Sequence, residues 1–233
     1  MATFELAMIV NGAKSLLELP VELRLRIFHY VLPENPLQVQ PADFSGLLYS
    51  CKTMQGELEP EICKALAQNL HEIASRIILM NTGRHTGHEI IYTPPTTFHG
   101  WLNLTVYRTT QRNVRDMLDS LVEFHSFGFN TFTVAFREDS QSCKSARAET
   151  SPIVNGATYL AKRVCDWGKY NGYLTTKRLV LDWSAHPEQP GMNFLDNFTN
   201  HVKADKTLEA RRLLDNAGNL AGMCFTRLPT KHT

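Results

Sequence analysis

The chain has 233 residues, of which 43% are hydrophobic and 20% charged, so it can bury one good core or two small ones, and a wholly disordered protein is excluded. Its 24 Lys and Arg nearly balance its 23 Asp and Glu, for a net charge of +1. No large net field therefore draws the protein to nucleic acid or to an anionic membrane. Five cysteines, an odd number without close paired spacing, favour reduced thiols inside a cell.

The sequence carries no sign of a membrane or export segment. No apolar run approaches the ~20 residues needed to cross a bilayer. The short apolar piece from Phe4 to Val10 contains Glu5 and has no basic segment ahead of it, unlike a secretory signal. We therefore expect a cytoplasmic or nuclear protein without a membrane partner.

The stretch from Ser15 to Leu32 predicts an amphipathic helix that begins near Pro20 and ends before Pro33. Proline is tolerated in the first turn of a helix, where its missing N–H would have no partner, but it cannot continue one. Arg24 and Leu25 lie mostly off the apolar stripe. The stripe itself repeats every fourth residue, at Leu19, Leu23, Ile27 and Val31, with Tyr30 beside it.

A second apolar block follows at a short distance. Phe44, Leu47, Leu48 and Cys51 fall at i, i+3, i+4 and i+7, which is typical of a helix face. Lys52 and Met54 come directly after it.

The two blocks together resemble the F-box. The order Leu-Pro-x-Glu-Leu-Arg from Leu19 to Arg24 is similar to the first F-box helix in the variant common in ascomycete fungi, which reads LPxELRxxI. The pair Cys51-Lys52 is similar to the Cys-Lys or Cys-Arg pair of the family's later segment. The resemblance covers roughly residues 15–58, about a quarter of the chain.

The resemblance implies an interaction adaptor rather than an enzyme. In F-box proteins this helical module docks on the Skp-type adaptor of an SCF ubiquitin ligase, and the rest of the chain binds a target protein. The implied partner-binding residues are Leu17, Leu19, Pro20, Leu23, Ile27, Val31, Leu48, Cys51 and Met54. The sequence does not separate those that form the module's core from those that form the docking surface.

Two other functions stay open. The same helices could be only the core of a stand-alone interaction protein, in which case they would be fully buried, whereas an exposed apolar patch would favour the ligase. An enzyme would need a deep pocket with titratable groups such as Asp182 and His186. No nucleophile elbow, Walker-type loop or Rossmann fingerprint occurs, so we assign no catalytic residue and no cofactor.

We also assign no metal site. His85, His88 and Glu89, with His99 downstream, are the only cluster with metal-ligand character, but they lie in a Gly-rich turn without a zinc-binding spacing. We interpret them as residues of a solvated loop.

A long helix should connect the first part of the chain to the second. Its apolar stripe runs through Leu58, Ile62, Leu66, Leu70, Ile73 and Ile77 to about Met80. Turn residues follow from Asn81 to Gly83, so we place a domain boundary there. Residues 1–82 would form the helical F-box-like module with its connecting helix, and residues 83–233 an α/β partner-binding domain.

The second part alternates between strand and helix patterns. Strands are predicted at 90–92, 101–107, 129–136 and 177–183, helices at 114–122, 157–167, 194–198 and 208–214 with a stop at Gly218, a solvated loop at 137–151, and a frayed end from Arg227. Connections of this length suggest crossovers rather than hairpins. The predicted class is α+β, with the helical module followed by a partly parallel sheet that has helices mainly on one face.

Polar residues at the ends of the predicted strands form a candidate target surface. In sheets with crossover helices, ligands bind beyond the carboxyl ends of the strands. The residues at or just past such ends are Arg108, Arg137, Glu138, Asp182 and His186. In an adaptor, a target protein would dock there.

Overall fold

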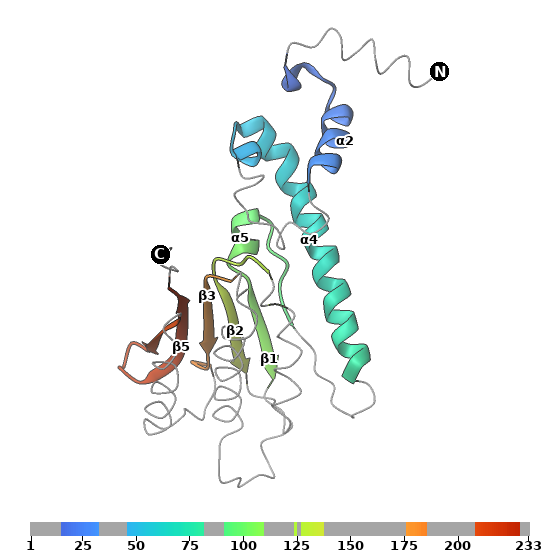
Figure 1. Cartoon of the computed structure of the whole chain (residues 1–233). Coiled ribbons are helices and arrows are strands. Elements are labelled where there is room, and N and C mark those ends of the chain that lie inside the picture. Colours follow the sequence, from blue (N-terminus) through green and yellow to red (C-terminus); the bar gives the residue numbers. More distant parts are fainter. Residues whose placement is uncertain are drawn as a thin grey trace, which may run out of the picture.

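The computed structural model describes residues 15–32, 46–81, 91–109, 124, 127–137, 176–185 and 208–228. N-terminal helices are followed by a five-stranded mixed sheet, as Figure 1 shows. The predicted α+β class with a partly parallel sheet is therefore confirmed.

The first α-helix begins and ends close to the two prolines that the sequence analysis used to predict its ends. A 3-10 turn, η1 (Leu16–Glu18), leads into helix α2 (Val21–Val31), with Pro20 at the N-cap. The Leu32 N–H closes the helix on the Phe28 carbonyl at 2.7 Å, one residue before Pro33. Both predicted ends of this helix are confirmed.

Helix α4 (Lys52–Asn81) is the longest element of the described chain. Its 30 residues span about 45 Å at the usual rise per residue. It begins six residues before the predicted stripe and continues through Pro60. The stripe residues Leu58, Ile62, Leu66, Leu70 and Ile73 are all buried, as predicted, whereas the Ile77 side chain lies outside the described residues. None of the described helices combines the length and apolar character needed to span a membrane.

The sheet combines a parallel part and an antiparallel hairpin. Its strands are β1 (Thr105–Thr109), β2 (Phe132–Arg137), β3 (Arg178–Asp182), β4 (Leu208–Leu214) and β5 (Leu220–Arg227), in the order β1-β2-β3-β5-β4. The first three run parallel, and β5 is antiparallel to both β3 and β4. Thr109 pairs with Arg137, and Ala135 with Asp182, so the carboxyl ends of the parallel strands meet at one edge.

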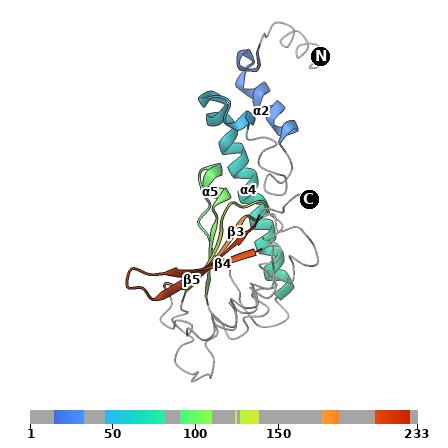
Figure 2. The ribbon, with the colours of Figure 1, turned by 60° about the vertical axis from the view of Figure 1, so that its left-hand side comes forward.

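The hairpin of β4 and β5 corrects the prediction for the end of the chain. Residues 208–214 form a strand rather than a helix, and β5 was not predicted. The apolar spacing around Leu208 suits a helix or a strand, and pairing with β5 decides for the strand. Gly218 is not a helix stop, because it lies in the turn between β4 and β5, where it takes a positive φ of 82°. The hairpin lies on the side of the sheet away from α4 in Figure 1, and Figure 2 shows its turn projecting beyond the other strands.

The predicted strand at 101–107 is also partly wrong. The short helix α5 (Phe98–Leu102) occupies its first residues, and β1 begins only at Thr105. The Thr97 hydroxyl accepts a hydrogen bond from the Gly100 N–H at 3.1 Å, which caps α5 and favours a helical turn over extended chain. Of the strand predicted at 90–92, the described part is an isolated antiparallel bridge between Ile91 and Tyr107.

One buried cluster reaches from the first helices to the last strand. It contains Phe28 of α2, the stripe of α4, Trp101 of α5 and inward side chains of the sheet as far as Phe225. A polar contact joins the same parts, since the Phe98 N–H donates to a Glu59 carboxylate oxygen at 2.8 Å. Helix α4 is thus tied to the start of the sheet.

Several predictions concern residues outside the described ranges. These are the helices at 114–122, 157–167 and 194–198, residues 138–151 of the predicted loop, the boundary at 82–83 and residues 229–233 of the predicted frayed end. They stay predictions. The first residues of that loop and of that end, Arg137 and Arg227, are instead the last residues of β2 and β5.

Candidate functional site

Helix α2 carries apolar residues on two faces. On the inner face Phe28 is 1% exposed, and Leu25 and Leu32 pack, partly buried, against the same core. Figure 1 shows this helix beside the first turns of α4 and away from the sheet. The inner face therefore attaches α2 to the rest of the protein.

The outer face of α2 consists of Leu23, Ile27, Tyr30 and Val31, at i, i+4, i+7 and i+8. Tyr30 is 85% exposed and Val31 54%, while Leu23 and Ile27 are half-buried. It contains the predicted stripe residues Leu23, Ile27 and Val31 with Tyr30, whereas Leu19 of that stripe is buried. At 3.6 residues per turn this face lies to one side of Phe28, with Val31 nearest to it and Tyr30 farthest around the helix. Apolar side chains gathered on one exposed face of a short helix are suited to binding another protein.

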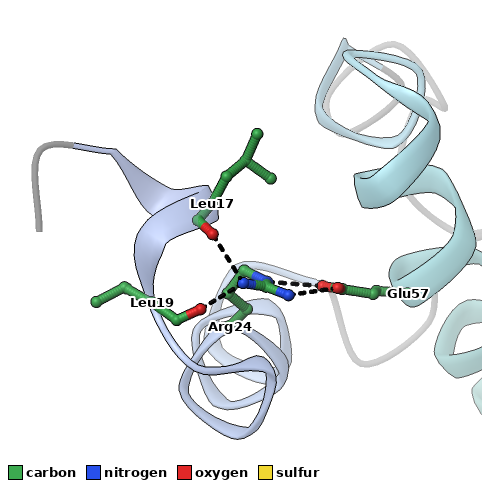
Figure 3. A network of polar contacts seen from close by, with 4 residues as sticks. All are labelled: Leu17, Leu19, Arg24 and Glu57. Carbon is green, nitrogen blue, oxygen red and sulfur yellow. Dashed lines mark hydrogen bonds and ion pairs between the residues drawn. The ribbon is translucent and has the colours of Figure 1, made fainter.

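Arg24 and Glu57, with the carbonyls of Leu17 and Leu19, form a polar clamp that joins α2 to α4 and to the turn before α2, as Figure 3 shows. The Arg24 guanidinium donates to the Glu57 carboxylate through Nε at 2.8 Å and Nη2 at 2.5 Å. Its Nη1 donates to the carbonyl oxygen of Leu17 at 3.1 Å and to that of Leu19. One side chain thus holds the turn before α2, α2 itself and the start of α4 together.

The clamp is charged at neutral pH. The hydrogen bond from Arg24 holds the pKa of the Glu57 carboxyl below its usual range, and the same bond raises the pKa of Arg24. Their side chains are only 11% and 19% exposed, so water and salt screen the pair less than an open surface pair.

The structure divides the residues that the resemblance implied for partner binding. Leu19, Leu48 and Met54 are buried in the core, Cys51 is partly buried against it, Leu23 and Ile27 are half-buried, and Leu17, Pro20 and Val31 are exposed. The buried members contact the module's own core. A partner can reach the exposed members together with the outer face.

Three residues that build this site, Phe28, Arg24 and Glu57, were not predicted from the sequence as site residues. Phe28 belongs to a second stripe, in which Leu25, Phe28 and Leu32 fall at i, i+3 and i+7, and this spacing could have indicated it. Arg24 lies off the apolar stripe, so periodicity does not single it out. Its partner Glu57 is 33 residues away, so no local pattern could have paired them.

The candidate target surface is described only in part. The carboxyl ends of β1, β2 and β3 meet at one edge, and there the Arg137 guanidinium stacks 3.7 Å from the centre of the Tyr107 ring. The Asp182 carboxylate accepts the Ser184 N–H at 2.9 Å. Arg108 lies in β1 opposite Phe136, but its side chain, Glu138 and His186 lie outside the described residues.

The described part of the chain places no three His, Cys, Asp or Glu side chains where they could hold a metal ion. His85, His88 and Glu89 lie outside it. Burial, with a smaller effect of the Glu59 charge, raises the pKa of the Cys63 thiol to about 11. Cys63 is therefore a neutral, weakly nucleophilic thiol at neutral pH.

Comparison with known proteins adds no relative, because no family model, no curated protein and no solved structure matches the chain. Function is therefore inferred from the residues described above.

Proposed function

We propose that this protein is an F-box-like adaptor that links a target protein to an SCF-type ubiquitin ligase in the cytoplasm or nucleus. The Skp-type adaptor of the ligase would bind the outer face of α2. The edge where β1, β2 and β3 end would receive the target.

The exposed outer face of α2 is the observation that carries the proposal. Tyr30 and Val31 are exposed on a helix whose inner face, around Phe28, is already occupied by the core. An apolar surface of this kind costs free energy in water unless a partner covers it. Tyrosine in particular is enriched where proteins bind each other, since its ring is apolar and its hydroxyl remains able to bond water.

The rest of the fold suits an adaptor as well. Helix α4 binds α2 at its beginning, and Glu59, only two residues after Glu57, bonds to α5 at the start of the sheet. The docking face and the sheet are therefore attached to the same turn of one helix. A target bound at the sheet edge would be held in a fixed position relative to the ligase.

The proposal is tested by co-expression with a fungal Skp-type adaptor followed by size-exclusion chromatography. The native chain should co-elute with the adaptor, and the double variant Tyr30→Asp/Val31→Asp should elute separately while keeping its native fold by circular dichroism. Charges placed at this interface would have to be desolvated without a partner. Deletion of residues 1–40 is less informative, because it also removes Phe28 and Arg24.

A matched control makes the same kind of change far from α2. Leu214 of β4 is 61% exposed, so Leu214→Asp also replaces an exposed apolar residue by a charge. This variant should still co-elute with the adaptor. Separate elution of the native chain at micromolar concentrations would reject the ligase function.

A second candidate is a stand-alone interaction protein that uses the same helices as core. It is favoured by the burial of Leu19, Leu48 and Met54, which belong to the F-box-like pattern yet face the protein interior. In that case the native chain would not bind the Skp-type adaptor. The outer face would then have another partner.

A further inference from the structure

Arg24 of α2 makes hydrogen bonds to two other segments, helix α4 and the turn before α2. Two of its nitrogens bind Glu57 in α4, and a third binds the carbonyls of Leu17 and Leu19 in the turn before α2. Carbonyls at the end of a short 3-10 turn lack donors within the turn, and Arg24 supplies them. Figure 3 shows both carbonyls directed at the guanidinium.

The chemistry of this contact requires arginine. A planar guanidinium donates two parallel bonds to a carboxylate and still has donors left for other acceptors, in fixed directions. A lysine ammonium would keep the charge attraction to Glu57 but not this geometry. An apolar side chain would leave the Glu57 carboxylate, which is only 19% exposed, without its cation.

The apolar contact of α2 does not by itself fix the direction of the helix. Phe28 is its one fully buried side chain, and Leu25 and Leu32 pack beside it only partly buried. Hydrophobic contact is not directional, so these contacts alone do not define the rotation of α2 about its axis. Arg24 lies one turn before Phe28, on the same side of the helix. The directional bonds of Arg24, one turn from Phe28, add to the apolar contact a fixed rotation of α2.

We propose that Arg24 is a positioning residue that fixes the rotation of α2 on α4, and with it the angle at which Tyr30 and Val31 face a partner. The effect on the angle at which Tyr30 and Val31 face a partner rests on the function proposed above. The effect on the rotation of α2 concerns only contacts within the chain and does not depend on that function.

The first test is amide hydrogen exchange of the whole chain. In Arg24→Met, the amides of α2 should exchange about ten-fold faster or more, because the helix opens locally, while those of β2 stay as in the native chain. Arg26→Met is the matched control, since Arg26 is an exposed arginine of the same helix, and it should leave exchange unchanged. If the α2 amides of Arg24→Met exchanged at the rates of the native chain, the inference would be overturned.

Exchanging the two charged residues distinguishes the ion pair with Glu57 from the hydrogen bonds to the carbonyls of Leu17 and Leu19. Arg24→Glu/Glu57→Arg can restore the ion pair between α2 and α4, but a glutamate at 24 cannot donate to the carbonyls of Leu17 and Leu19. Protection should return in α2 and stay low at the Glu18 and Leu19 amides, which close η1. Failure to recover any protection in α2 would show that Arg24 acts only by packing and would overturn the positioning role.

Binding to the Skp-type adaptor tests the second part. Arg24→Met should weaken binding about ten-fold and Arg26→Met should not, because a helix that rotates freely binds in only a fraction of its orientations. Native affinity in Arg24→Met, together with lost protection in α2, would overturn the link to the partner. If the native chain does not bind the adaptor, the proposed function fails, and hydrogen exchange still decides whether Arg24 positions α2.

Discussion

Helix α2 and strand β2 are held in opposite ways. The 11 residues of α2 include one fully buried side chain, Phe28, and an arginine clamp. The six residues of β2 include four buried ones, Phe132, Val134, Ala135 and Phe136. The strand lies between β1 and β3, so its backbone forms hydrogen bonds to a neighbouring strand along both edges.

The comparison indicates that β2 serves mainly to stabilise the fold, whereas α2 also has a surface for binding another protein. A strand buried in this way offers a partner only its carboxyl end, at Arg137, and substitutions at its buried positions act on folding. A helix attached by one face keeps the other for binding, and needs a directional contact to stay in position. The three predictions below test this contrast, from the largest expected effect to the smallest.

The largest effect should come from the core of the sheet. Phe132 is fully buried and stacks on Phe124 and Phe129, so Phe132→Ala leaves a cavity and should lower the free energy of unfolding by about 3 to 5 kcal/mol. Urea unfolding followed by circular dichroism measures the loss. The neighbouring Thr133→Ala, on a half-buried side chain, should cost about 1 kcal/mol or less. Equal losses in the two variants would contradict this account of the sheet.

A smaller and more local effect is expected at the anchor of α2. Phe28→Ala should destabilise the attachment of this helix by about 3 kcal/mol without unfolding the sheet. Trypsin should then cleave faster after Arg24 and Arg26, while β2 amides keep their protection. Tyr30→Ala, on the exposed outer face, should change stability by no more than about 0.5 kcal/mol. If the β2 amides lost their protection together with α2, the two regions would unfold as one unit, contrary to this prediction.

The smallest effect is a dependence on acid that is confined to the clamp. The pKa of Glu57 lies below its usual value of 4.5, so the folded state favours the carboxylate. The resulting stability is present above the usual pKa and is lost as the pH falls through the lowered pKa of the folded protein. On acidification from about pH 6 to about pH 3, α2 amides should therefore lose protection before those of β2.

Glu57→Gln is the control for the acid effect. Glutamine keeps an oxygen for Arg24 but does not titrate, so protection of α2 in this variant should be lower at neutral pH and should change less on acidification. Simultaneous loss of protection in α2 and β2 in the native chain would indicate that other carboxylates dominate.

The sequence by itself determined the elements whose signals are local. Prolines fixed both ends of α2, an apolar stripe predicted the buried face of α4, and runs of β-branched and aromatic residues predicted β2 and β3. The outer face of α2 was visible as a stripe for the same reason. These patterns depend on residues within one or two turns of each other.

Tertiary structure decided the features that depend on distant partners. Strand β4 became a strand because β5 pairs with it, and β5 itself, with Gly222 packed so closely that a Cβ would lie 2.5 Å from the Leu181 carbonyl, is defined by its neighbours in the sheet. The face by which α2 attaches was decided by Phe28 and by the pairing of Arg24 with Glu57 across 33 residues. Local periodicity shows that a helix has apolar faces, but only packing and directional hydrogen bonds select the one that is buried.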